Sequence, residues 1–352
     1  MGLPEGDRLG LLSKWERGKK NLITDVPGVR VGSVTLKQGE VNTGVTALLP
    51  HGGNLFLDKV MAATSILNGF GKSVGLIQVE ELGTIETPIL LTNTLSVGTA
   101  LAALTKYMLK QNEDIGVSTG TVNCVVTECN DGRLNDIRGM HVAEEHVWQA
   151  IGKAAFDFEE GAVGGGTGMC CMGVKGGIGS ASRIVMADGG DYAIGALVMS
   201  NFGSTGKLMI GGQPIGKKIR DQKELEKKEG GEKQGGEKDQ GSIIMILATD
   251  IPLSERQLKR LANRTAISLG RTGSCMGNGS GDLAVAFTTA NRIPHYSEKS
   301  ILDVKMFHDE SMDPVFEAGI EAVEEAIISS LYHAETTTGV RGKTIKGLRE
   351  YL

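Results

Sequence analysis

The sequence predicts a mixed α/β protein in which glycine-rich strands and turns pack against amphipathic helices. Two observations favour this fold class. Apolar runs of strand length alternate with longer segments of helical periodicity along the 352 residues. Glycine contributes 51 residues whereas aromatic residues make up only 4%, so aliphatic side chains must build a core of closely packed layers.

The first part of the chain provides two strands and two helices. Residues 29–36 and 44–49 have the composition of strands, and a Pro-His-Gly-Gly turn follows the second of them. Residues 58–67 carry small and apolar side chains at helical spacing and end at Asn-Gly, so we predict a helix there. A clearer helix, rich in alanine and leucine, is predicted over residues 94–109.

The middle of the chain continues this alternation. Residues 121–128 indicate a strand and residues 142–158 a helix. Residues 161–183 are so rich in glycine that we expect close approach between backbones, either between strands or around a pocket.

The last part of the chain begins with a sharp discontinuity. Residues 217–240 are dominated by charged residues, glutamine and glycine, so we predict a mobile exposed loop. The apolar run 243–248 directly after it indicates a buried strand. Residues 254–269 then form an amphipathic helix with Ser254 as its N-cap. A strand over residues 282–289 and a helix over residues 313–330 complete the pattern.

Composition and charge exclude several classes of function. A net charge of −5 provides no general attraction to nucleic acid or to an anionic membrane. The first twenty residues lack the apolar stretch of a signal peptide, and no window has the apolar length that spans a bilayer. The five cysteines include no CxxC pair, which argues against a zinc site or a disulfide framework. We therefore expect a cytoplasmic protein without a metal ion or other cofactor.

The boundary between the polar segment and the buried strand is the most informative position. A long polar insertion alone is usually only a tolerated surface loop, but this one ends at Gly241-Ser242, directly before the strand. Attack of the Ser242 hydroxyl on the Gly241 carbonyl would form an ester, and hydrolysis would leave Ser242 as a new amino terminus. Its α-amine, with an unperturbed pKa of about 7.7–8.0, can then serve as the base for its own hydroxyl.

This route to an activated serine requires no histidine. The six histidines are scattered and form no triad signature, so a histidine-dependent serine hydrolase is the weaker interpretation. The sequence therefore predicts a hydrolase in which Ser242 is both the cleavage site and the nucleophile.

At this point a specific resemblance appears. The chain resembles the P1/S58 peptidase family, the group of L-aminopeptidase D-Ala-esterase/amidases and β-peptidyl aminopeptidases, from about residue 21 to residue 291 and more loosely to the end. The matching stretches are residues 21–32 (NLITDVPGVRVG), 130–137 (NDGRLNDI), 160–161 (EG), 164–168 (GGGTG), 200–203 (SNFG), 241–244 (GSII) and 279–282 (GSGD).

The resemblance implies a four-layer αββα sandwich, built as one structural domain from an autoprocessed precursor. Residues 1–241 would become the larger chain and residues 242–352 the smaller one. The family's site residues correspond to Ser242 as nucleophile, with Ser280 and Asp282 beside it. By itself, Ser-Gly-Asp is equally typical of a turn or the start of a strand.

The remaining predicted site residues also come from the resemblance. Asn201 corresponds to the family's oxyanion donor, although a simple strand-end turn with Gly203 would explain it too. Asn130, Arg133 and Asn135 correspond to the loop of the substrate pocket. Arg133 stands where some relatives have an aromatic residue near the oxyanion, a difference expected to affect substrate choice.

The expected activity is that of a serine aminopeptidase or amidase, which removes the first residue from small peptides, amides or esters through an acyl-enzyme. The resemblance also implies a homotetramer of processed protomers. Two alternatives stay open. One is an acyltransferase of related fold, similar to ornithine acetyltransferases, against which the serine argues because those enzymes use threonine. The other is a non-catalytic binding or assembly protein that retained the fold.

Overall fold

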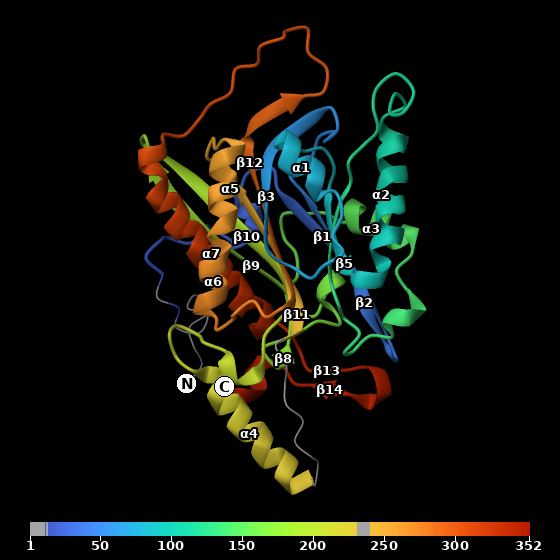
Figure 1. Cartoon of the computed structure of the whole chain (residues 1–352), viewed down its shortest axis with the longest axis vertical. Coiled ribbons are helices and arrows are strands. Elements are labelled where there is room, and N and C mark those ends of the chain that lie inside the picture. The colour runs from blue at the N-terminus through green and yellow to red at the C-terminus, as the bar shows by residue number, and fades with distance from the viewer. Residues whose placement is uncertain (1–10, 12, 231–239) are drawn as a thin grey trace.

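The computed structural model describes residue 11, residues 13–230 and residues 240–352, and two β-sheets lie at its centre (Figure 1). The larger sheet has the order β4-β3-β12-β11-β10-β9. Its strands are β3 (Asp58–Gly69), β4 (Thr84–Ile85), β9 (Gly177–Ala187), β10 (Gly190–Asn201), β11 (Gln240–Thr249) and β12 (Gly279–Pro294). β11 and β12 are parallel, and the other neighbouring pairs are antiparallel.

The smaller sheet has the order β1-β2-β5-β6. Its strands are β1 (Arg30–Gln38), β2 (Val41–Leu49), β5 (Ile89–Asn93) and β6 (Val125–Cys129). One apolar cluster contains residues of both sheets, among them Leu91 of the smaller and Ile244 and Val285 of the larger, so the two sheets share a core. Short two-stranded ribbons are formed by β7 (Cys170–Cys171) with β8 (Val174–Lys175) and by β13 (Thr337–Thr338) with β14 (Thr344–Ile345).

The helices pack mainly on the outer faces of the two sheets (Figure 1). The larger sheet carries α5 (Glu255–Asn263), α6 (Thr265–Arg271) and α7 (Met312–Tyr332), and the smaller sheet carries α2 (Val97–Gln111) and α3 (Glu144–Gly152). α1 (Leu76–Leu82) lies against β3, and α4 (Ile215–Gly230) extends from one end of the molecule. Each face of each sheet is therefore buried against another element, as the aliphatic composition requires.

Most predicted strands and helices are confirmed. The strand predicted over residues 243–248 is the buried centre of β11, and the helix predicted over residues 313–330 lies within α7. Ser254 caps α5 as expected, because its Oγ accepts a hydrogen bond from the Gln257 N–H at 3.3 Å. Other boundaries shift: the helix predicted over residues 142–158 is only α3, and the predicted helix 254–269 is broken into α5 and α6.

The helix predicted over residues 58–67 is wrong, because this segment is the strand β3. β3 pairs with β12 on one side and with the short β4 on the other. Both faces of its central part are buried, so the apolar residues form a nearly continuous run that periodicity cannot distinguish from a helix. The β-branched residues Val60, Thr64 and Ile66 favour the strand.

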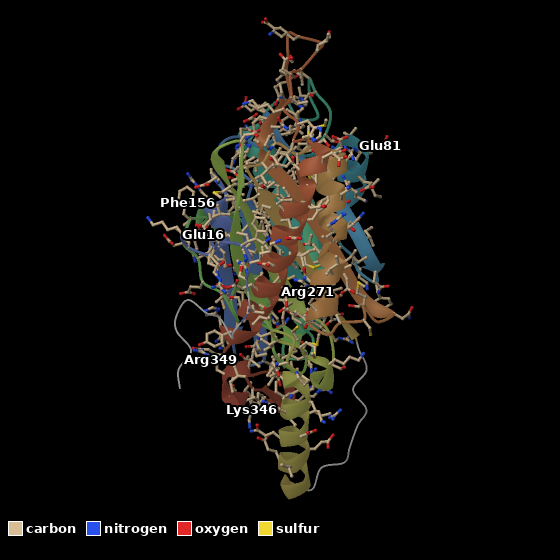
Figure 2. The ribbon with its side chains drawn as sticks, turned by 90° about the vertical axis from the view of Figure 1, so that its left-hand side faces the viewer. Glu16, Glu81, Phe156, Arg271, Lys346 and Arg349 are labelled. Carbon is tan, nitrogen blue, oxygen red and sulfur yellow. The ribbon has the colours of Figure 1, made fainter. Side chains whose placement is uncertain are left out.

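The mobile loop predicted over residues 217–240 is wrong for its first part, which belongs to the helix α4; residues 231–239 lie outside the described residues. Lysine, glutamate, glutamine and leucine all have high helix propensity, so a segment of low hydrophobicity can still form a helix. Tertiary contacts hold the helix: Ile219 is buried, and Glu226 pairs with Lys346 at 2.9 Å. Figure 2 shows Lys346 beside the part of α4 nearest the body of the molecule.

The close backbone approach predicted from the glycine-rich residues 161–183 is confirmed. A Cβ atom on Gly177 would lie 2.0 Å from the carbonyl oxygen of Gly161, so no larger residue fits there. This packing brings residues 161–177 against the end of β10, next to the starts of β11 and β12. Several chain segments thus converge at one end of the larger sheet.

Candidate active site

A cavity of about 530 Å³ lies where these segments converge. It lies at the end of β10 and the starts of β11 and β12, and segments that follow β3 and β6 complete it. The lining residues are Phe70, Lys72, Thr94, Glu128, Asn130, Arg133, Cys170, Asn201, Gly203, Gly241, Ser242 and Gly279. The cavity therefore contains both residues of the predicted cleavage site.

Ser242 is the third residue of β11 and is held between two neighbouring strands. It is paired with Asn201 of β10 and with Gly281 of β12. The residue is only 5% exposed, so its accessible surface faces the cavity rather than bulk solvent. A Cβ atom on Gly281 would lie 3.0 Å from Ser242 Oγ, so glycine at this position leaves room around the hydroxyl.

Gly241 has a backbone conformation that other residues rarely adopt. Its φ is +151°, and a Cβ atom on it would lie 1.9 Å from the carbonyl oxygen of Asn201. Only glycine fits these two conditions. The peptide bond between Gly241 and Ser242 borders the cavity, because both residues line it.

Ser280 and Asp282 are joined to each other and buried. Ser280 Oγ donates a hydrogen bond of 2.6 Å to Asp282 Oδ1, and both residues are almost fully shielded from solvent. Neither lines the cavity. In the parallel pairing, Ser280 lies opposite Gly241 and Asp282 lies opposite Ile243.

Strand alternation separates this pair from the Ser242 hydroxyl. Ile244 belongs to the apolar cluster between the sheets, whereas Ile243 belongs to the cluster under α5 and α7. Side chains alternate along a strand, so Ser242 shares the face of Ile244 and Asp282 shares the opposite face with Ile243. The structure therefore brings Ser280 and Asp282 to the backbone of the Gly241–Ser242 junction, on the far side of the strand from the hydroxyl.

Asn201 is fixed in place at the end of β10. Its Nδ2 donates to the carbonyl oxygen of Asn130 at 2.9 Å, and its Oδ1 accepts from the Cys170 N–H at 2.9 Å. An amide nitrogen carries two hydrogens, so a second one is available toward the cavity. Asn201 is the register partner of Ser242, which makes it a suitable donor to an oxyanion formed there.

The three predicted pocket-loop residues separate into two groups. Asn130 and Arg133 line the cavity, whereas Asn135 does not. The Asn135 side chain accepts from the Asn42 N–H at 3.0 Å and donates to Asp131 Oδ1 at 3.0 Å. Asn135 therefore stabilises the pocket loop through contacts that lie outside the cavity. Burial raises the pKa of the Asp131 carboxyl to about 6.

Sequence reasoning missed Glu128, which is the one acidic side chain among the described residues that line the cavity. Glu128 is the fourth residue of β6 and is 3% exposed. One of its oxygens accepts from the Lys72 N–H at 2.7 Å, and the other accepts from the Thr94 hydroxyl. The available signal was the one charged residue in a predicted strand directly before the pocket loop. Burying a carboxylate costs free energy, so a carboxylate in such a position indicates a functional role.

A buried cation, Lys175, supports the segment of the cavity wall that carries Cys170. The Lys175 ammonium donates to the carbonyl oxygens of Gly166, Met169 and Gly176 at 3.1, 2.8 and 2.6 Å. It is fully buried, and burial lowers its pKa to about 8. These bonds fix the segment that carries Cys170, whose own pKa is raised by burial. Cys170 is thus a neutral lining residue rather than a competing nucleophile.

The described residues lack two other kinds of feature. They contain no group of three histidine, cysteine, aspartate or glutamate side chains arranged to hold a metal ion. No helix in this described part of the chain has the length and apolar character needed to cross a membrane.

Known proteins resemble this chain over nearly its whole length. Residues 21–345 match the model of peptidase family S58. The β-peptidyl aminopeptidase BapA of Sphingosinicella microcystinivorans is 40% identical, over 98% of this chain and 89% of its own. The crystal structure of the PH0078 protein from Pyrococcus horikoshii OT3 is similar with a TM-score of 0.90 and 52% identity, over 98% of this chain and 96% of that one. The L-aminopeptidase D-Ala-esterase/amidase of Ochrobactrum anthropi, a prototype of the serine aminopeptidases with a variant Ntn hydrolase fold, has a TM-score of 0.88 and 38% identity over 97% and 95%.

Proposed function

The chain belongs to peptidase family S58 and is a serine aminopeptidase, and from this premise we propose that it is activated by cutting its own Gly241–Ser242 bond. Ser242 Oγ attacks the Gly241 carbonyl carbon, the peptide nitrogen leaves as the free α-amine, and water then hydrolyses the ester. The observation that carries this proposal is that Gly241 and Ser242 border the same cavity, in a conformation open only to glycine. Residues 1–241 and 242–352 then form one two-chain protomer.

Turnover uses the same serine. Its hydroxyl attacks the scissile carbonyl of a bound substrate, and the second Nδ2 hydrogen of Asn201 donates to the oxyanion. Such a donor contributes about 3–4 kcal/mol to transition-state stabilisation in other hydrolases. The leaving amine departs, water hydrolyses the acyl-enzyme, and Ser242 is regenerated.

The base in turnover is the α-amine that cleavage creates on Ser242. The amine comes from the nitrogen of the Gly241–Ser242 peptide bond. It therefore forms beside Ser280, because Gly241 is paired with Ser280 in the sheet. Ser280 can accept a hydrogen bond from the ammonium, and Asp282 orients Ser280 through their 2.6 Å bond and balances the charge. The position of this pair behind the strand suits a role toward the amine rather than toward the hydroxyl.

Glu128 is proposed to bind the free amino end of the substrate. Its carboxylate lines the cavity, with no other carboxylate among the described lining residues, and its two hydrogen bonds fix the orientation of the group. The ammonium of Lys72 lies over the Phe70 ring, 4.5 Å from the ring centroid, rather than against Glu128. A buried carboxylate that faces a ligand cavity favours a cationic substrate group, which an aminopeptidase requires.

The substrates proposed for this chain follow the names of its relatives. They are small peptides, amides or esters with a free amino end, including those of β-amino acids. We further propose that the packed sheets and helices form the four-layer αββα sandwich of the processed family members, since the apolar clusters lie between the sheets and on both outer faces.

Intact mass spectrometry and N-terminal sequencing test this function. The precursor of 37.2 kDa should give fragments of about 25 and about 12 kDa, scaled by length, and the smaller should begin Ser-Ile-Ile-Met. Ser242→Ala should abolish processing and reduce amino-acid p-nitroanilide hydrolysis to background, since the only nucleophile is lost. Ser118→Ala, at an exposed serine, is the matched control and should behave as wild type.

Two results would contradict the proposal. The first is a chain that stays intact and yet hydrolyses the p-nitroanilides, and the second is a new terminus at another residue. The acyltransferase alternative is tested in the same assay, because it requires turnover to rise when an amine acceptor such as ornithine replaces water in deacylation.

A further inference from the structure

The wall of the cavity that carries Glu128 also contains a short segment, residues 70–74, which is held at three points. The Phe70 N–H donates to a carbonyl oxygen of β12 at 3.2 Å, and the Lys72 N–H donates to Glu128 Oε1 at 2.7 Å. The last residue of the segment forms two backbone hydrogen bonds, of 2.9 and 3.2 Å, with β6. The segment therefore joins the end of β3 in the larger sheet to β6 in the smaller one, and it fixes the backbone of Lys72 beside the Glu128 carboxylate.

The side chain of Lys72 is exposed at the edge of the cavity, and its ammonium contacts no carboxylate among the described residues. The ammonium lies over the Phe70 ring, 4.5 Å from the ring centroid, and both residues line the cavity. Glu128 instead accepts hydrogen bonds from the Lys72 backbone N–H and from the Thr94 hydroxyl. A side chain that already lies over an aromatic ring has less freedom to lose on binding, so Lys72 is partly preorganised to bind an anion.

Glu128 and Lys72 thus present an anion and a cation on the same wall, the first buried and the second exposed. Glu128 would repel a carboxylate that came alone, but a carboxylate next to an ammonium offers the wall both signs of charge. The carboxyl carbon of an α-amino acid lies about 2.5 Å from its amino nitrogen. A first residue that carries both groups on one carbon can therefore place its ammonium against Glu128 and its carboxylate toward Lys72.

We propose that Lys72 binds a carboxylate on the first residue of the substrate, beside the amino group that Glu128 binds. This inference rests on the proposed function, which supplies the position of the amino group. The substrates that satisfy it best are isoaspartyl peptides, in which an aspartyl residue is linked to the next residue through its side-chain carboxyl group. Their free α-carboxylate and their amine share one carbon. Two carbons separate the amine from the scissile carbonyl, as in the β-amino acids proposed above.

The same carboxylate chemistry has a second source, the side chain of an ordinary aspartyl residue, and two pairs of p-nitroanilides distinguish the sources. The first pair is isoaspartyl p-nitroanilide and its analogue with an α-carboxamide. The second pair is aspartyl p-nitroanilide and asparaginyl p-nitroanilide. The readout is the kcat/KM of each acid divided by the kcat/KM of its amide. This ratio is compared between processed proteins, so that a general loss of activity and the intrinsic reactivity of each substrate cancel.

Lys72→Gln should lower the isoaspartyl ratio about fivefold, mostly through KM, as expected for an ion pair at an accessible site. Lys72→Arg keeps the charge and should keep most of the preference. Both variants retain the backbone N–H that bonds Glu128, so the binding position of the amine is maintained.

Lys110→Gln is the matched control and should keep the wild-type ratio. Lys110 is also an exposed lysine over an aromatic ring, with its ammonium 3.8 Å from the Trp148 ring centroid, but it does not line the cavity. An equal fall of the ratio in Lys110→Gln would attribute the effect to net charge and overturn the inference.

The remaining outcomes separate this inference from the proposed function. A fall in the ratio for one pair only identifies the carboxylate that Lys72 binds, and a fall for both pairs shows that it binds either. If Lys72→Gln leaves both ratios at their wild-type values, the inference is overturned and the proposed function stands. The same holds if wild-type protein cleaves neutral amino-acid p-nitroanilides but neither acid. If wild-type protein hydrolyses no p-nitroanilide, neutral or acidic, the proposed function fails and the inference with it.

Discussion

The segments on the two sides of the Gly241–Ser242 junction differ in how firmly they are held. β11, which follows the junction, lies between two strands, and its residues 243–248 are at most 1% exposed. α4, which comes before it in the chain, extends away from the body in both views (Figures 1 and 2). Its Leu225 is 62% exposed, and Arg220 and Glu224 form a surface ion pair of 3.8 Å.

This difference meets two demands that the proposed self-cleavage would place on the chain. The nucleophile must be held within fractions of an ångström, which a central strand provides. The new carboxyl end at Gly241 would have to leave the cavity without disturbing the core, which an exposed preceding helix with few buried side chains permits. Three experiments test the comparison, in decreasing order of expected effect.

Gly241→Ala should produce the largest effect, because the new Cβ would overlap the Asn201 carbonyl oxygen at 1.9 Å. Relief of this overlap moves the scissile bond or Asn201, and a displacement of about 1 Å costs roughly 100-fold in rate. We expect processing to slow by at least about that factor, measured from the appearance of the two fragments on a denaturing gel. Gly98→Ala, where a Cβ meets nothing within 4 Å, is the control and should process normally. Normal processing of Gly241→Ala would show that the junction is less constrained than its geometry indicates.

The second test compares stability on the two sides of the junction in a Ser242→Ala background, which keeps the chain intact. Ile244→Ala should lower the free energy of unfolding by about 2–5 kcal/mol, because it leaves a cavity in the core between the sheets. Leu225→Ala should lower it by less than about 0.5 kcal/mol, as at most exposed positions. Urea denaturation measures both. Equal losses would mean that α4 is as firmly integrated as β11.

The smallest effect is expected for Asp282→Asn, which changes the environment of the amine without moving the strand. In the processed enzyme the Asp282 carboxylate stabilises the Ser242 ammonium and so raises the pKa of the amine. The amine must be deprotonated to act as base, so the acidic limb of the pH–rate profile follows this pKa. Loss of the charge lowers the pKa, and we expect the limb to move to lower pH by about one unit. Should a folded, fully processed Asp282→Asn enzyme keep its limb unchanged, Asp282 would have no electrostatic influence on the amine.

The family, the activity and most elements were predictable from the sequence. The GSII and GSGD motifs lie on adjacent parallel strands. Each motif is a short stretch of consecutive residues, so it can be identified without knowledge of the fold. The errors have physical causes. β3 is buried on both faces and lacks alternation, and α4 has a helical composition with too few apolar residues to indicate packing.

The walls of the candidate site were harder to predict than the presence of Ser242 in it. Glu128 acquires its position only because β6 of the smaller sheet ends near Lys72, which follows β3 of the larger one. Asn135 belongs to the same motif as Asn130 and Arg133, yet its amide turns inward to Asn42. Such contacts join residues far apart in the chain, and no local pattern encodes them.

The order of strands in the larger sheet has a consequence for the life of the enzyme. After the proposed cleavage β11 and β12 would belong almost entirely to the smaller fragment, and β3 and β10 of the larger fragment would flank them on both sides. Once the junction is cut, neither fragment has a complete sheet of its own, and the two can part only if the shared sheet opens. Refolding would then require two separate chains to associate before the shared sheet could form. An enzyme processed in the proposed way would therefore depend on slow unfolding rather than on reversible refolding, and its active lifetime would be set by the first event that opens the sheet.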